Sequence, residues 1–188
     1  MRERIARLIG ASGERVWAST FHSTCVRILR EEIDHLGYDK NFVIYDDSDQ
    51  QTVIKQILKE LNLDDKKYPP RAVSSRLSTY KNELQTPAAA MKAAFGDFIE
   101  EQYAQVYGNY QERLLKNNAL DFDDLIMLTV QLLQENPEVL DKYQERFQYI
   151  MVDEYQDTNT SQYMLIKLLA KKYRNLCVVG DDDQSIYQ

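Results

Sequence analysis

Two acidic clusters near the C-terminal end of the chain carry the side chains best suited to chemistry. The first lies in FQYIMVDEYQDTN (147–159) and the second in LCVVGDDDQSIY (176–187). Each cluster follows a short apolar run, which is the pattern of a fully buried β-strand that stops at acidic residues. Carboxylates at such strand ends suit a hydrated Mg²⁺ ion and the phosphates that it carries. The pattern therefore predicts a site for a magnesium-bound nucleotide.

The segment between the two apolar runs has the periodicity of a helix. One helical face of TSQYMLIKLLAKKY (160–173) carries Tyr163, Ile166, Ala170 and Tyr173. Strand, helix and strand form a βαβ unit, which brings both strand C-termini to one edge of a parallel sheet. Ligands of open α/β folds usually bind at that edge. The two acidic clusters are thus expected to lie side by side.

Length and composition are those of a globular protein. The chain has 188 residues, of which 44% are hydrophobic and 28% are charged, so it can bury a sizeable core. Its apolar runs are too short to cross a bilayer and no signal-peptide pattern opens it, so no membrane partner is expected. The two cysteines, Cys25 and Cys177, form no spaced framework, which favours a reducing, cytoplasmic compartment.

The net charge of -7 conceals four segments of alternating sign. Residues 1–30 carry six Arg and two Glu, a charge of +4, and residues 31–65 carry -7. Residues 66–116 carry +3, and residues 117–188 again carry -7. Basic segments can face a phosphate backbone while acidic segments hold metal or face solvent. The overall acidity therefore does not exclude a nucleic-acid partner.

Helical patterns occupy most of the remaining chain. VWAST (16–20) has the pattern of a short buried strand, and a helix that starts at Phe21 is expected to end at Gly37. In a later helix, over 121–135, Phe122 and Leu125 are among the residues expected to face the core. Other helices are expected over 1–10, after Asp46–Asp49, after Pro69 and Pro70, from Pro87 and over 97–118. This order predicts a helical insertion into an α/β domain.

The motifs together resemble a known family. VWASTFHSTCVRILR, KNEL (81–84), LDFDDLI (120–126), IMVDEYQDTN and VVGDDDQSIY resemble, in order and spacing, motifs of the PcrA/UvrD/Rep group of superfamily 1 DNA helicases. DEYQDTN followed by GDDDQSIY is the specific part of the likeness, whereas TFHS or LDFDDL alone is weak evidence.

The resemblance implies an α/β fold, a partial RecA-like parallel-sheet P-loop NTPase domain with an inserted all-helical subdomain. Residues 1–36 would be the first part of the motor domain, residues 37–120 the inserted subdomain, and residues 121–188 the return to the motor domain. None of the six glycines is followed by Lys, so the phosphate loop G-x-x-x-x-G-K-[ST] (Walker A) is absent from these residues. We therefore expect a fragment that alone neither hydrolyses ATP nor unwinds DNA.

By resemblance, the two acidic motifs carry the catalytic residues. Asp153 would hold Mg²⁺, and Glu154 would orient or deprotonate the water that attacks the γ-phosphate of ATP. Gln184 would sense the γ-phosphate and couple hydrolysis to the grip on DNA. Tyr187 would stack on a base of single-stranded DNA, with core packing as the alternative. An isolated Asp-Glu pair would more often only cap a strand, but its place within DEYQDTN favours the catalytic role.

Other polar residues have two open interpretations each. Thr20 and His22, where a strand turns into a helix, would contact the DNA backbone, with helix capping by Thr20 or Ser23 as the alternative. Gln156 and Asp157 resemble residues that tie their loop to neighbouring motifs, and capping of the next helix is compatible with that role; the candidate caps are Asp157, Thr158 and Asn159. A basic stretch is either a solvated face or a duplex contact, and it comprises Lys66, Lys67, Arg71, Arg76 and Lys81.

The resemblance implies a parent protein that is an ATP-dependent DNA helicase. It would couple ATP hydrolysis to 3′ to 5′ translocation on single-stranded DNA and to duplex unwinding. ATP and Mg²⁺ would be its cofactors, and single-stranded and duplex DNA its partners, in the cytoplasm. Two alternatives stay open, namely a non-catalytic nucleic-acid- or protein-binding module of the same fold, and part of a helicase–nuclease. DNA repair, replication restart and plasmid replication all remain possible pathways.

Overall fold

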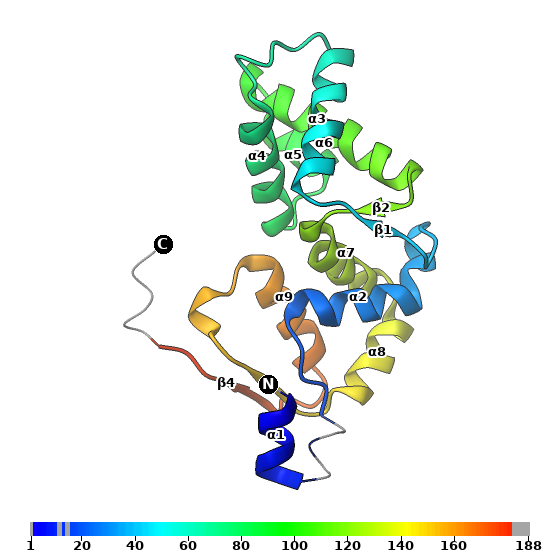
Figure 1. Cartoon of the computed structure of the whole chain (residues 1–188), viewed down its shortest axis with the longest axis vertical. Coiled ribbons are helices and arrows are strands. Elements are labelled where there is room, and N and C mark those ends of the chain that lie inside the picture. The colour runs from blue at the N-terminus through cyan, green and yellow to red at the C-terminus, as the bar shows by residue number, and fades with distance from the viewer. Residues whose placement is uncertain (1, 11–12, 14–15, 182–188) are drawn as a thin grey trace.

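A computed structural model describes residues 2–10, 13 and 16–181, and most of these residues are helical (Figure 1). The helices are α1 (Arg2–Ile9), α2 (Phe21–Glu32), α3 (Asp47–Glu60), α4 (Pro70–Asn82), α5 (Pro87–Ala93), α6 (Phe98–Lys116), α7 (Phe122–Glu135), α8 (Pro137–Arg146) and α9 (Thr160–Ala170). Short 3₁₀ helices are η2 (Ile33–Leu36) and η3 (Tyr155–Asp157). The strands are β1 (Val43–Ile44), β2 (Ala119–Leu120), β3 (Ile150–Val152) and β4 (Leu176–Val178).

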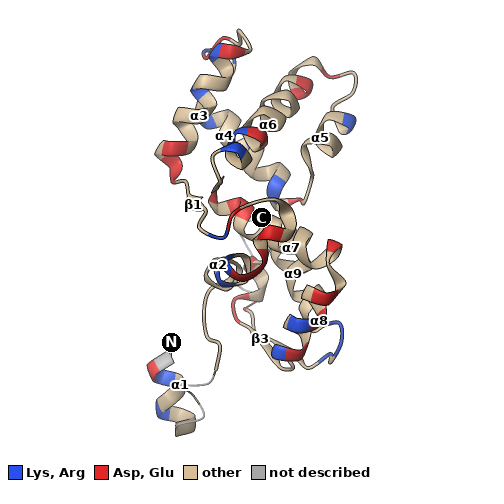
Figure 2. Cartoon of the chain, turned by 90° about the vertical axis from the view of Figure 1, so that its right-hand side faces the viewer, with Lys and Arg blue, Asp and Glu red and all other residues tan. Residues whose placement is uncertain are grey.

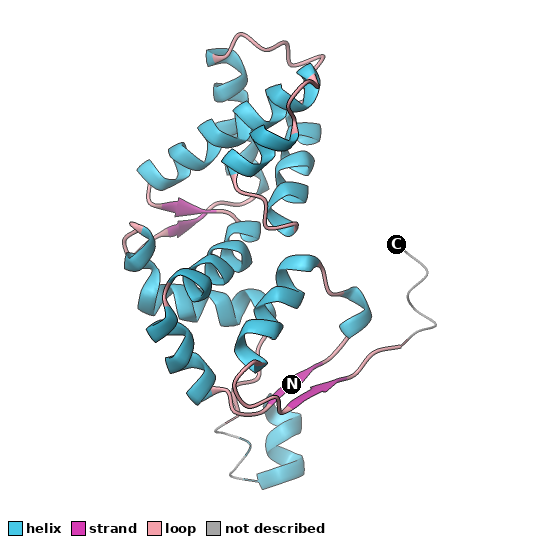
Figure 3. Ribbon diagram, turned by 180° about the vertical axis from the view of Figure 1, so that it is seen from behind, coloured by secondary structure: helices cyan, strands magenta, loops and turns pink. Residues whose placement is uncertain are grey.

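The helices pack around two separate hydrophobic clusters. Side chains of α3, α4, α5 and α6 form one cluster, which we call the α3–α6 core. Side chains of α2, α7, α8 and α9 form the other, which we call the α2–α9 core. The two groups of helices are stacked along the long axis of the molecule, with β1 and β2 between them (Figures 1 and 3).

The strands β1 and β2 form a parallel pair where the chain passes from one group to the other. Val43 pairs with Ala119 and Ile44 with Leu120. The Val43 amide donates to Asn118 at 3.0 Å, and the Tyr45 amide donates to Leu120 at 2.8 Å. We expected an almost purely helical stretch here, and this expectation missed both strands. Two residues are too few to show an alternating pattern, so only their distant pairing defines them as strands.

The expected βαβ unit is present. β3 and β4 are parallel, with Ile150 opposite Leu176 and Val152 opposite Val178, and α9 connects them. The expectation that both strands are fully buried was wrong. Val152 is buried, but Met151, on the opposite face, is 76% exposed and every residue of β4 is exposed, including Cys177. Successive strand residues point to opposite faces, and among the described residues β3 and β4 form a sheet of only two strands.

The expected strand at 16–20 does not form. The Val16 amide donates to the Gly13 carbonyl and the Ala18 amide to the Val16 carbonyl, and such local bonds are typical of turns rather than of a β-ladder. Trp17 instead packs edge-on against Phe147, with ring centroids 5.2 Å apart. This segment therefore reaches α2 as an irregular loop.

Most helix ends follow their sequence signals. Asp46 and Asp121 each form a capping box, and Pro70 and Pro87 open their helices. The helix that starts at Phe21 ends at Glu32, earlier than expected, and Gly37 instead ends η2 with φ +83°, a left-handed conformation that suits glycine.

The expected inward face of the helix over 121–135 was partly wrong. Phe122 is 54% exposed, because it is the first residue of α7, where the helix emerges from the core. On α9, the face that groups Tyr163 with Ile166 is buried only at Ile166, and the other buried apolar residues are Leu165 and Leu169. No described helix is both long and apolar enough to span a membrane.

The capping box of α3 gives a test of these local signals. Replacing Asp46 with Ala removes the acceptor for the amides of Ser48 and Asp49, so we expect the free energy of unfolding to fall by about 1 kcal/mol. Urea unfolding measures this loss. Asp47→Ala, in the same turn, is the control and should cost only a few tenths of that, since it removes a dipole interaction alone. Equal losses in the two variants would contradict the capping role.

Candidate functional site

The loop after β3 holds the two predicted catalytic carboxylates in an exposed position. Asp153 follows the last residue of β3, and its Oδ1 accepts the Glu154 amide at 3.0 Å. Glu154 has φ +52° and ψ +43°, a left-handed conformation that costs a non-glycine residue about 1 kcal/mol. Gln156 Nε2 donates to Glu154 Oε2 at 2.7 Å. A strained residue held by its neighbours is typical of functional loops.

Gln156 also joins this loop to the segment after β4. Its Oε1 accepts the Asp181 amide at 3.1 Å, and the Tyr155 amide donates to Val179 at 3.0 Å. At Gly180, an added Cβ would lie 2.8 Å from Gln156 Oε1, so a larger residue there would displace the Gln156 side chain. The two acidic motifs therefore begin side by side, as expected. Two predicted site residues of the second motif, Gln184 and Tyr187, lie outside the described residues.

The three candidate caps of α9 are distinguished by geometry. Asn159 Oδ1 accepts the Gln162 amide at 2.9 Å, and the Asn159 backbone amide donates to Gln162 Oε1 at 3.2 Å, which completes a capping box. Thr158 Oγ1 instead donates to the carbonyl of Tyr155 at 2.8 Å. Asn159 is thus the cap, and Asp157 belongs to η3.

The carboxylates after β3 fit the way that proteins hold Mg²⁺. This ion usually keeps several waters and takes one or two carboxylates together with substrate phosphates. Asp153 is exposed at a strand end, where its second oxygen can face such a hydrated ion, and Glu154 is adjacent. Among the described residues, no group of three or more His, Cys, Asp or Glu side chains could hold a metal without such help.

The turn that precedes α2 exposes Thr20 and half-buries His22. Thr20 Oγ1 accepts the Ser23 amide at 3.2 Å, so the capping interpretation of Thr20 is correct, although its hydroxyl stays exposed. The His22 ring lies 5.4 Å from the ring of Phe122. Burial lowers the pKa of His22 and the charge of Asp123 opposes that shift only in part, so the neutral imidazole prevails at pH 7.

The sequence analysis did not identify Phe122 as a candidate nucleic-acid contact. Its ring is exposed beside the His22 ring, which gives this surface an aromatic face. The sequence signal was present but was assigned to the core, because Phe122 shares its helical face with Leu125 and Ile126, which are buried.

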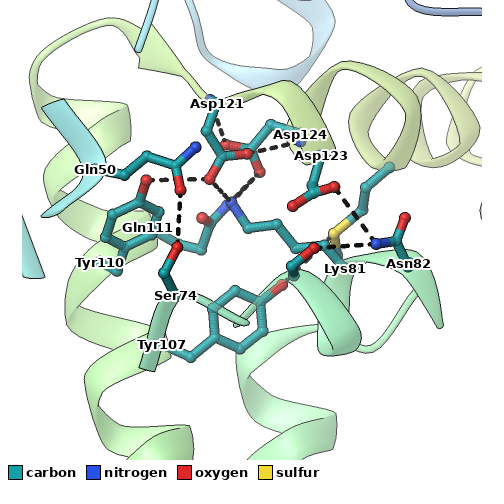
Figure 4. Close-up of polar contacts among 12 residues, drawn as sticks. Gln50, Ser74, Lys81, Asn82, Tyr107, Tyr110, Gln111, Asp121, Asp123 and Asp124 are labelled. Atoms are coloured by element: carbon teal, nitrogen blue, oxygen red, sulfur yellow. Dashed lines mark hydrogen bonds and ion pairs between the residues drawn. The ribbon is translucent and has the colours of Figure 1, made fainter. Parts of the chain in front are cut away.

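Lys81 is buried and belongs to a charged cluster, not to a basic surface. Its Nζ lies 2.6 Å from Asp121 Oδ2 and 2.8 Å from Asp124 Oδ1 (Figure 4). Tyr110 donates to Asp121 at 3.1 Å, and Gln111 donates to Asp124 at 3.0 Å. The cluster joins α4, α6 and α7, and its placement of Lys81 corrects the expected solvated or duplex-binding role of this residue.

The charges of this cluster shift one another's proton affinities. Burial and the neighbouring charge of Asp121 raise the pKa of Asp124 above its ordinary range. Burial opposes ionisation of Asp121 as well, but Lys81 holds the pKa of Asp121 below its ordinary value. Burial likewise opposes the charge of Lys81, yet the two carboxylates keep its pKa above normal. KNEL and LDFDDLI were recognised as motifs, but their mutual contact was not expected.

The remaining basic stretch is mixed with acidic residues. Lys66, Lys67 and Arg71 are exposed, whereas Arg76 forms an ion pair with Glu100 at 2.5 Å. Acidic and basic residues lie side by side at the tip between α3 and α4 (Figure 2). The cationic surface of this stretch is therefore smaller than the sequence indicated.

Comparison with known proteins identifies the family. The model described as UvrD/REP helicase N-terminal domain matches residues 1–188, and the chain belongs to this family. Curated relatives named ATP-dependent DNA helicase PcrA are 56% identical over 187 residues in Staphylococcus aureus and 55% identical over 188 residues in Bacillus subtilis. A third, from Staphylococcus epidermidis, is 54% identical over 187 residues. Each alignment covers 100% of this chain and 26%, 25% and 26% of the respective relative, so the chain spans about a quarter of their length.

The buried cluster generates a stability prediction. In Lys81→Met, Asp121 and Asp124 stay buried without their counterion, so we expect the free energy of unfolding to fall by about 3–5 kcal/mol at neutral pH. Without Lys81, both carboxylates would have raised pKa values in the folded state. Protonation of these carboxylates would then remove their unpaired charge. The loss in the free energy of unfolding should therefore shrink as the pH falls from about 7 to about 5.

Chemical denaturation of both proteins across this pH range measures the difference. The exposed Lys66→Met is the matched control and should change stability by less than about 0.5 kcal/mol. A loss in Lys81→Met that stays constant with pH would contradict the proposed electrostatic origin.

Proposed function

We propose that this chain supplies part of the first motor domain of an ATP-dependent DNA helicase. This proposal rests mainly on the exposed Asp153–Glu154 pair after β3, which Gln156 joins to the start of the second acidic motif at Asp181. Membership of the UvrD/REP helicase N-terminal domain family supports this proposal. The parent would couple ATP hydrolysis to 3′ to 5′ translocation on single-stranded DNA and to duplex unwinding.

In the proposed reaction the chain's residues position charge and water. Bound Mg²⁺ would neutralise charge on the phosphate oxygens of ATP. Asp153 would hold the ion through its waters, and Glu154 would orient or deprotonate the attacking water. The bond from Gln156 limits the rotation of the Glu154 side chain, which favours one orientation for that task. Gln184 would sense the γ-phosphate.

The arrangement of the cores supports an inserted helical subdomain. The α3–α6 core is separate from the α2–α9 core, and the β1–β2 pair closes the point where the chain leaves and returns. Tyr38 and Phe42 belong to the α2–α9 core, so we place the subdomain between β1 and β2, a few residues inside the expected range of 37–120. Residues 1–42 and 121–188 would then belong to the motor domain.

The nucleic-acid contacts would lie on two surfaces. Thr20 and His22 would contact the backbone of single-stranded DNA, and Phe122 beside them would stack on a base, as would Tyr187. Exposed Lys66 and Lys67, at the tip of the α3–α6 group, would contact duplex DNA through its phosphates.

The test of the catalytic proposal is Glu154→Gln in the full-length protein that carries this chain. Gln still accepts the bond from Gln156 but cannot serve as a base, so we expect DNA-stimulated ATP turnover to fall by about 10²- to 10⁴-fold. Steady-state hydrolysis with and without single-stranded DNA measures it. Glu138→Gln, an exposed carboxylate on α8, is the control and should leave turnover unchanged. If the wild-type protein folds but shows no turnover, the binding-module alternative gains support.

The duplex contact has its own test. Replacing Lys66 and Lys67 with Glu should weaken duplex affinity. The slope of the logarithm of the binding constant against the logarithm of salt concentration should become shallower by about two. Titration of a labelled duplex at several salt concentrations measures both quantities. The matched control replaces Lys55 and Lys59 with Glu; both are exposed on α3 of the same helical group. Unchanged affinity and slope would mean that Lys66 and Lys67 only form a solvated face.

A further inference from the structure

The C-terminal turn of α4 is held from three directions. Lys81 reaches inward to Asp121 and Asp124. Leu84 has φ +59°, and its side chain packs against the α2–α9 core. Asn82 lies between these two residues and points to a third neighbour, the N-terminus of α9. Because a left-handed leucine is strained, the surrounding contacts must hold this turn in one conformation.

The side-chain amide of Asn82 joins three elements. Its Nδ2 donates to Ser78 Oγ on α4 at 3.2 Å and lies 3.4 Å from Asp123 Oδ1 on α7 (Figure 4). Its Oδ1 accepts a bond from Asn159 Nδ2 at 2.7 Å. One amide thus uses both its donor and its acceptor to tie the end of the α3–α6 group to α7 and to α9.

The partner of this bond is well placed to move the catalytic loop. Asn159 caps α9 and ends the segment that begins at Asp153. That segment is closed by bonds from Asp157 to Glu154 and from Thr158 to Tyr155, at 3.1 and 3.2 Å. A displacement of Asn159 is therefore transmitted through a short, bonded loop to Glu154.

Within the part of the chain that the structure describes, the wall between α4 and this loop is mostly an open polar surface. A polar groove of about 460 Å³ lies between them, and it is lined by Ser75, Ser78, Thr79, Asn82, Glu83, Thr158, Asn159 and Thr160. Hydroxyl and amide groups in an open groove exchange readily with water, so they fix the two walls weakly. The 2.7 Å bond between Asn82 and Asn159 spans the groove as a direct link.

We infer that Asn82 is a positioning residue that couples the α3–α6 group to the loop carrying Asp153 and Glu154. The bond from Asn159 to Asn82 sets the position of the loop relative to α4, which is itself fixed by Lys81. This inference rests on the proposed function for its consequence in turnover. The link between α4 and the loop is physical and can be measured without any activity.

The experiment uses the full-length protein in four forms, which are wild type, Asn82→Ala, Asn159→Ser and the double variant. Serine retains a cap for α9 but does not reach Asn82, so this substitution removes the link and keeps the helix start. Ser75→Ala, in the same groove, is the matched control. Hydrogen exchange is followed at the amides of 155–163, and ATP turnover is measured with and without single-stranded DNA.

We expect exchange at 155–163 to accelerate by about five-fold in each single variant, as loss of one hydrogen bond implies. The DNA-stimulated kcat should fall by a similar factor of about five, with unchanged KM for ATP and unchanged DNA affinity. The double variant should be no worse than either single variant, because both remove the same bond. Ser75→Ala should match wild type.

Two results would overturn the inference. Unchanged exchange at 155–163 in Asn82→Ala would remove the physical link, and additive losses in the double variant would show that the two residues act separately. If wild-type protein shows no DNA-stimulated turnover, the proposed function fails, and with it the coupling in catalysis. The exchange comparison would still decide whether Asn82 positions the loop.

Discussion

The buried contact of Lys81 with Asp121 and Asp124 is the constraint on which the arrangement of the helices depends. Burying Lys81 without its carboxylate partners would cost several kcal/mol. The folded state therefore requires α4, which carries Lys81, to pack against the start of α7, which carries Asp121 and Asp124. Tyr110 and Gln111 satisfy further acceptor positions from α6. The cluster therefore fixes the α3–α6 group to the N-terminus of α7, next to which Phe122, His22 and Asn82 lie.

A second constraint is the parallel pairing of β3 with β4. Parallel strands joined by a helix must end at the same edge, so Asp153 and Asp181 emerge close together. Gln156 then uses its amide to bind both segments, and Gly180 leaves room for the Gln156 side chain in this position. The site is built from short loops on strand ends, which combines a fixed position with exposed carboxylates.

These two constraints meet at α9. Its N-cap, Asn159, ends the loop that starts at β3, and it bonds to Asn82 at the end of α4. The buried face of α9 packs in the α2–α9 core through Leu165 and Leu169. A helix held at its start by a hydrogen bond and along its length by apolar packing can transmit a displacement as a rigid unit.

The sequence by itself determined what depends on neighbours a few residues apart. The capping boxes at Asp46 and Asp121 and the βαβ pattern were all predictable, since caps and periodicity act within one helical turn or one strand. Tertiary structure decided what depends on residues far apart. The β1–β2 pair joins residues about 76 positions apart, from Val43 to Ala119. Lys81 is buried only because Asp121 and Asp124 meet it, and VWAST forms local turn bonds in place of the expected strand, so no local pattern could reveal either outcome.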